Sequence, residues 1–151
     1  MKTYKKVFLL LSLAIISISA MAEIKISDIT NKGKEAICKI GARRTSDQYQ
    51  LLNIPNELEG LQAVSIPRGS FDKAGTDFSF KVSVPVTIYL FVDKRYKKVT
   101  LEGWEKTKMT AGWLDKKHGD VIYKKNFPAG IVEIPANPMG VLPHLAVVKE
   151  K

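Results

Sequence analysis

Phe78–Arg95 reads FSFKVSVPVTIYLFVDKR and is the longest run of β-forming residues in the chain. Its first part, Phe78–Val84, alternates apolar and polar side chains, which is typical of a strand with one buried face. After Pro85, the run Val86–Val92 is apolar at nearly every position, as in a strand at the centre of a packed sheet. Because proline cannot donate to a ladder, Pro85 predicts a bend or bulge between two strands. A charged corner, Asp93–Arg95, ends the stretch.

Shorter segments with strand character lie on both sides of this stretch and are separated by turns. They cover residues 24–29, 35–40, 48–54, 61–66, 121–126, 131–134 and 144–148. The segment 94–119 shows no sustained period and is predicted to be a long irregular connection, with room for one short helix or strand. About eight or nine short strands without a long amphipathic helix predict an all-β fold, an antiparallel β-sandwich of jelly-roll type.

Residues 1–22 have the pattern of an export signal. A lysine-rich start precedes the apolar run 7–20, and Ala20 and Ala22 are the small residues expected around a cleavage site before Glu23. The run is shorter than the ~20 residues that span a bilayer, so we expect cleavage, with a retained anchor as the weaker alternative. The mature protein is then a single domain, residues 23–151, in the periplasm or outside the cell.

The charge of the chain argues against a nucleic-acid partner. The net charge is +9, and cleavage before Glu23 removes three lysines and no acidic residue, which leaves +6. The basic residues are scattered, and export argues against nucleic acid as a partner. Weak attraction to an acidic polysaccharide or an anionic surface stays open.

Cysteine, histidine and glutamate are too few or too dispersed to indicate an active site. Cys38 is the only cysteine, so no intrachain disulfide is possible, and its alternating neighbours predict a buried residue rather than a reactive thiol. His118 and His144 neighbour no candidate nucleophile and have no zinc-ligand spacing with Cys38. The closest glutamate pairs are Glu57/Glu59 and Glu102/Glu105, in turn-like segments typical of surface acids. We expect no catalysis, no cofactor and no metal.

Aromatic residues after the central stretch are candidate sugar-binding groups. Trp104, Trp113 and Tyr96 lie in the segment predicted to be irregular, and loops carry binding groups more often than strands do. Asp93 and Arg95 are the polar groups that would bond sugar hydroxyls. The alternative is structural: Trp104 closes the end of the sandwich, and Asp93 and Arg95 hold a corner through an ion pair and backbone hydrogen bonds.

Three further residues have roles that the sequence predicts only as alternatives or as structural. Trp113 is equally compatible with an exposed and a buried position. Asn137 either binds a ligand or bonds the backbone of its own loop, and the second interpretation is favoured. Gly130 is predicted to adopt a positive φ in the turn formed by residues 128–130.

Several blocks along the sequence form a pattern of fixed order and spacing: Asp47-Gln48-Tyr49, Ile54-Pro55, Leu58-Glu59-Gly60, Phe78-Ser79-Phe80, Val84–Tyr89, Asp93-Lys94-Arg95, Trp104, Tyr123–Gly130 and Asn137. In order and spacing these blocks resemble a β-sandwich module found beside secreted bacterial glycoside hydrolases and polysaccharide lyases. The chain departs from the pattern at Phe91-Val92, at Pro135-Ala136 and in the residues before Trp104. The resemblance implies a non-catalytic accessory domain that helps with carbohydrate attachment or enzyme architecture.

These observations leave three functions open. The first is an exported, non-catalytic carbohydrate-associated domain whose partner is a polysaccharide or a polysaccharide-degrading enzyme. The second is a periplasmic or surface protein-interaction module without sugar binding. The third, ranked last, is a small secreted enzyme, which would need a cleft with converging carboxylates.

Overall fold

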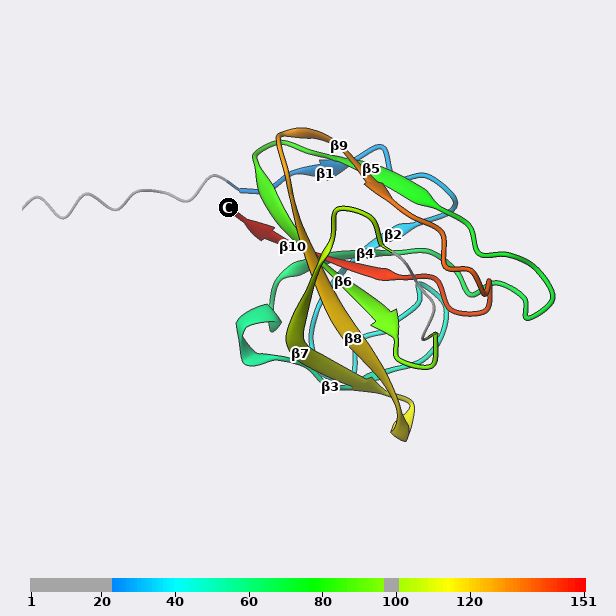
Figure 1. Cartoon of the computed structure of the whole chain (residues 1–151). Helices are drawn as coiled ribbons and strands as arrows, with labels where there is room; N and C mark the ends of the chain where they lie inside the picture. Colours follow the sequence, from blue (N-terminus) through cyan, green and yellow to red (C-terminus); the bar gives the residue numbers. More distant parts are fainter. Residues whose placement is uncertain (1–22, 97–100) are drawn as a thin grey trace, which may run out of the picture.

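The computed structural model describes residues 23–96 and 101–151, so the export signal predicted for residues 1–22 lies outside the described residues. The strands of the described part form two antiparallel sheets that pack face to face (Figure 1), which confirms the predicted all-β sandwich. The small sheet has the order β1-β5-β9: Ile26–Ser27, Phe78–Val82 and Gly130–Ile134. The large sheet has the order β2-β4-β10-β6-β8-β7-β3: Lys34–Ile37, Gln62–Ser65, Leu145–Glu150, Val86–Asp93, Asp115–Phe127, Glu105–Trp113 and Leu51–Asn53.

Pro85 lies at the corner where the chain passes from the small sheet to the large one. β5 ends at Val82 and β6 begins at Val86, so three residues make the crossing. The carbonyl of Pro85 accepts a hydrogen bond from the amide of Lys151 (3.2 Å), which ties the corner to the end of β10. The break predicted inside the long β-forming stretch is therefore a change of sheet.

β6 is the central strand of the large sheet, between β10 and β8. Val86, Ile88, Leu90 and Val92 contribute to the core between the two sheets. Phe91, whose side chain points to the opposite face, belongs to a second core. Burial on both faces explains why the sequence of β6 is apolar at nearly every position.

The second core exists because the large sheet curls back on itself. β3 pairs with β7 at one end of the sheet. The amide of Gly41 donates to the carbonyl of Leu51, and the amide of Leu51 donates to the carbonyl of Ala42, each at 2.8 Å. These two bonds join β3 to the segment that follows β2 at the other end of the sheet. Cys38 lies in this core with 1% of its surface exposed, as predicted, and burial raises the pKa of its thiol to about 12.

The prediction of an irregular connection over residues 94–119 is wrong for most of its length. Residues 105–113 form β7, which makes a long hairpin with β8. β7 does alternate, and its inward-facing side chains are Thr107, Met109, Ala111 and Trp113. Because this face begins with a polar residue and includes a small alanine, its apolar periodicity is too weak to detect. The strands predicted at 24–29 and 48–54 are present but shorter than predicted; they are β1 and β3.

Gly130 begins β9 at the corner where the chain returns to the small sheet. Its φ is +121°, which confirms the predicted positive value, and a Cβ added there would meet no atom within 4 Å. Gly130→Ala is therefore expected to cost about 1–3 kcal/mol of unfolding free energy through backbone strain alone. Gly112→Ala is the matched control, because its added Cβ would make ordinary contacts from 3.6 Å outward. Denaturant titration of both variants measures the difference, and equal midpoints would contradict the strain argument.

Candidate functional site

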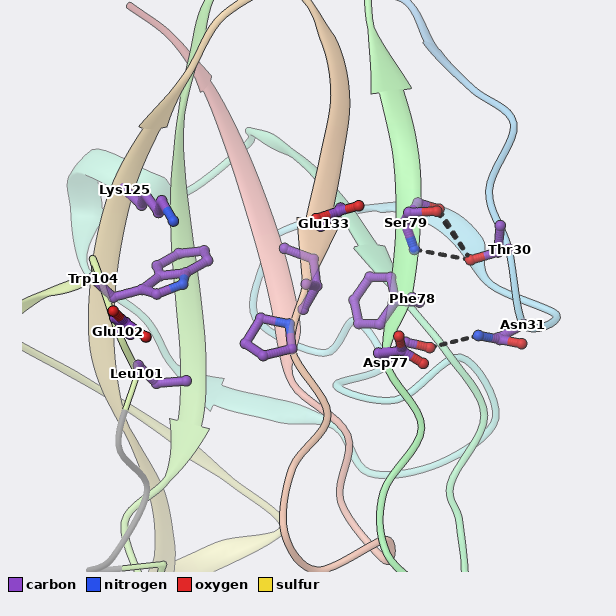
Figure 2. A pocket seen from close by; sticks show the side chains of 12 residues that line it. Thr30, Asn31, Asp77, Phe78, Ser79, Leu101, Glu102, Trp104, Lys125 and Glu133 are labelled. Atoms are coloured by element: carbon purple, nitrogen blue, oxygen red, sulfur yellow. Dashed lines mark hydrogen bonds between the residues drawn. The ribbon is translucent and has the colours of Figure 1, made fainter.

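A groove with a volume of about 530 Å³ lies beside the small sheet, where the turn before β7 faces the end of β9 (Figure 2). Figure 2 shows Trp104 and Lys125 on one side, Asp77 and Asn31 on the other, and Glu133 between them. The lining residues come from five parts of the chain: Thr30 and Asn31; Asp77, Phe78 and Ser79; Leu101, Glu102 and Trp104; Lys125 of β8; and Glu133, Ile134 and Pro135.

A tight turn places Trp104 at the groove. The amide of Trp104 donates to the carbonyl of Leu101 (3.1 Å), and Gly103 in this turn has φ +76°. The indole packs against the ring of Phe127 at 5.9 Å between centroids, with a tilt of 58°. Trp104 is half-buried. One part of it therefore closes the side of the core, and the rest is open to the groove.

The opposite wall is fixed by hydrogen bonds between the loop after β1 and the start of β5. The Nδ2 of Asn31 donates to the carbonyl of Asp77 (2.5 Å). The amide of Ser79 donates to the Oγ1 of Thr30 (2.8 Å), and the amide of Thr30 donates to the carbonyl of Ser79 (3.0 Å). These bonds hold polar side chains at the rim, across the groove from an aromatic ring.

This arrangement suits a small polar ligand with one apolar face. An aromatic ring supplies a flat apolar surface, and the carboxylates, hydroxyls and amide around it supply hydrogen-bond partners. Small-molecule sites usually have this form, a partly apolar hollow on which a few polar groups converge.

Asp93, Arg95 and Tyr96 form a separate corner at the end of β6. The Nη2 and Nε of Arg95 donate to the carboxylate of buried Asp93 at 2.6–3.1 Å, and the amide of Arg95 donates to its Oδ1 (3.0 Å). The hydrogen bond to Asp93 raises the pKa of Arg95. Its guanidinium lies 6.0 Å from the ring of Tyr96. The ion pair and backbone bonds are those that the structural interpretation predicted.

Trp113 is buried beneath this corner, with 1% of its surface exposed. The rings of Tyr49 and His118 lie 5.2 and 4.9 Å from it, and the guanidinium carbons of Arg95 and Arg44 lie 5.8 and 5.5 Å from it. Neighbouring side chains thus occupy the ring faces on which a sugar would stack. Asp93, Arg95 and Trp113 share a corner, but they do not form an exposed platform with Trp104.

Arg44 and Asp120 form a buried ion pair that no sequence signal indicated. Both side chains are 0% exposed, and Nη2 lies 2.6 Å from Oδ1. The Nη1 of Arg44 also donates to the carbonyl of Pro143 (2.7 Å), and Nη2 donates to the carbonyl of Phe91 (3.3 Å). Burial raises the pKa of Asp120, and the guanidinium of Arg44 opposes that effect. The pair holds the loop after β2 against β8 and the start of β10.

His144 is a second buried polar group near Arg44. It is 1% exposed, and neither ring nitrogen has a hydrogen-bond partner within the described residues. Burial, together with the positive charge of Arg44, lowers its pKa to about 3. The imidazole is therefore neutral at pH 7.

Asn137 bonds the backbone of its own loop. Its Nδ2 donates to the carbonyl of Leu142 (2.7 Å), and its Oδ1 accepts from the amide of Met139 (3.1 Å), while the residue itself is 1% exposed. The six candidate residues thus lie in three places: the groove, the Asp93 corner and this loop. That any of them binds a ligand stays a prediction.

Most of the groove was not foreseen. Trp104 is the one groove residue that the sequence predicts as a candidate binding residue, because it is an aromatic residue in a segment predicted to be irregular. Asn31, Asp77 and Glu133 reach the same groove because β1, β5 and β9 are neighbours in the small sheet. Each is an ordinary polar residue in its local context, so no motif marks it.

Comparison with known proteins finds no matching family model and no matching curated protein sequence. Solved structures do match. A β-glucuronidase from glycoside hydrolase family 2 superimposes with a TM-score of 0.65 at 16% identity, over 84% of this chain and 14% of that chain. A GH138 enzyme targeting pectin rhamnogalacturonan II gives 0.56 at 18% identity, over 84% of this chain and 16% of that chain. The shared property is the fold. The chain matches about one seventh of the length of the first hydrolase and about one sixth of the length of the second.

Within residues 23–96 and 101–151, no helix is long and apolar enough to cross a membrane. No three or more His, Cys, Asp or Glu side chains of this part are grouped so that they could hold a metal ion.

Proposed function

We propose that this protein is an exported, non-catalytic, carbohydrate-associated domain that binds a glycan in the groove beside Trp104. The observation that carries the proposal is the half-exposed indole of Trp104 in a polar groove of about 530 Å³. A pyranose ring has an apolar face and a rim of hydroxyl groups, so it matches a flat ring surrounded by hydrogen-bonding side chains. The likeness in fold to segments of two glycoside hydrolases supports the association with carbohydrate.

The positions of the perturbed titratable groups support a non-catalytic role. Strongly displaced pKa values often mark catalytic residues. In this protein the pKa of Cys38 is raised to about 12 and that of His144 is lowered to about 3. Both residues are buried in the interior, and neither lines the groove.

Trp104→Ala is expected to weaken glycan binding by about 30-fold or more, as truncation of a central aromatic residue does at other binding sites. A glycan array and affinity gels with neutral, acidic and amino-sugar polysaccharides would identify a ligand, and calorimetry would measure its affinity. Trp104→Phe keeps a flat ring and should restore part of the binding. Phe71→Ala is the matched control, because Phe71 is 68% exposed and lies outside the groove.

Three outcomes would contradict this proposal. A folded wild-type domain that binds no polysaccharide would leave the protein-interaction module as the better function. Equal losses of glycan affinity in Trp104→Ala and Phe71→Ala would indicate that the glycan binds outside the groove. Release of reducing ends from a bound polysaccharide by the wild-type protein would show that the domain is catalytic. Circular dichroism of each variant establishes that its fold is unchanged.

A further inference from the structure

The groove is acidic, although the chain as a whole carries a net charge of +9. Among the described lining residues, Asp77, Glu102 and Glu133 contribute three carboxylates, and Lys125 contributes the one ammonium group. Among residues 23–96 and 101–151, none of these three carboxylates forms an ion pair with another side chain. Other acids of the described chain, such as Asp28, Asp93 and Asp120, do have basic partners.

Lys125 lies against aromatic rings on one wall. Its Nζ is 5.9 Å from the ring centroid of Trp104 and 5.5 Å from that of Phe127, within the range of cation–π attraction. The ammonium group is therefore placed on the Trp104 side of the groove, away from Asp77 on the opposite wall (Figure 2). The remaining lining has an excess of negative charge.

The three carboxylates are distributed along the groove and do not converge on one point. Glu102 lies in the turn before β7, Glu133 lies in β9, and Asp77 immediately precedes β5. They do not make up a group able to hold a metal ion. Carboxylates spread around an aromatic ring complement a ligand that carries several positive or hydrogen-donating groups at intervals, as a chain of sugars does.

We propose that the groove selects a glycan that carries free amino groups, such as linked glucosamine units, over neutral glycans and over polyuronates. This inference rests on the proposed function, because it names the class of sugar that the same groove would bind. An ammonium group on the sugar would pair with Glu102, Glu133 or Asp77, whereas the carboxylate of a uronate would face like charges and be disfavoured. The indole of Trp104 stacks equally well on each of these sugars, so the acids set the preference.

The test compares three hexasaccharides at about pH 6, where glutamate and aspartate are ionised and amino sugars carry positive charge. The probes are glucosamine hexamer, its N-acetylated counterpart and galacturonate hexamer. Calorimetry at low ionic strength is expected to give the tightest binding for glucosamine, weaker binding for the N-acetylated chain and the weakest for galacturonate. From one hexasaccharide to the next, the affinity should fall by about twofold to fivefold per charge. Added salt should reduce these differences in affinity.

Glu102→Gln and Glu133→Gln should each reduce the preference for glucosamine over its N-acetylated form, because each amide keeps a hydrogen-bonding group but loses the negative charge. Glu57→Gln is the matched control, because Glu57 is an exposed glutamate outside the groove, and it should preserve the preference. Equal or tighter binding of the N-acetylated or galacturonate hexamer overturns this inference but leaves the proposed function standing. Failure of the wild type to bind any glycan overturns both.

Discussion

Arg44→Met is expected to lower the free energy of unfolding by about 3–5 kcal/mol, because it leaves the buried carboxylate of Asp120 without its partner. Both side chains are 0% exposed, with Nη2 and Oδ1 2.6 Å apart. The same guanidinium bonds the carbonyls of Pro143 and Phe91, so the substitution also removes donors from two backbone acceptors. Urea titration at pH 7 measures the loss.

The double variant Arg44→Met/Asp120→Leu is expected to recover much of this loss. Replacement of both members of a buried ion pair by apolar side chains removes the unpaired charge, which causes most of the cost. Lys81→Met is the control, because Lys81 forms an exposed pair with Asp28, with side chains 53% and 63% exposed. It should leave the urea midpoint unchanged. An Arg44→Met midpoint as close to the wild type as that of Lys81→Met would refute a stabilising role for the buried pair.

The part of the fold that could be predicted is the part encoded by local periodicity. Residues 78–84 alternate and residues 86–92 do not, and this difference correctly distinguishes a strand with one buried face from the central strand of the sandwich. Pro85 marks the change of sheet because a proline has no amide hydrogen to donate to a ladder. This effect is local, so it can be predicted from the sequence. β7 was not predicted because Thr107 and Ala111 supply little apolar signal on its inward face.

The candidate site was much less predictable, because its residues are joined only by the fold. Arg44 and Asp120 are separated by 76 positions in the sequence, and their pairing depends on the curling of the large sheet. Strand pairing in the small sheet brings Asn31, Asp77 and Glu133 close together, and the packing of the large sheet against it places Trp104 beside them. Conversely, the sequence left the exposed and the buried position of Trp113 equally open, and the second core buries it.

Acidification is expected to destabilise the domain through His144, by about 3 kcal/mol between pH 7 and pH 4. In the unfolded chain the imidazole has its ordinary pKa of 6.5, whereas burial lowers its pKa to about 3 in the folded protein. Between these two values only the unfolded state binds the proton, so stability is complete above pH 6.5 and falls as the pH decreases toward 3. Urea titrations at several pH values would measure this slope.

His144→Leu should flatten the pH dependence and change stability little at pH 7. Neither ring nitrogen of His144 has a hydrogen-bond partner within the described residues, so leucine leaves no buried donor or acceptor unpaired. His118→Leu is the matched histidine control, because His118 is only half-buried and its Nδ1 lies 2.7 Å from the exposed Asp115 carboxylate. That variant should keep the acid slope contributed by His144. If wild type and His144→Leu lost stability equally between pH 7 and pH 4, the imidazole would have to accept its proton as readily in the folded state as in the unfolded chain. A neutral, buried His144 beside the Arg44–Asp120 pair would then be the wrong description of this core.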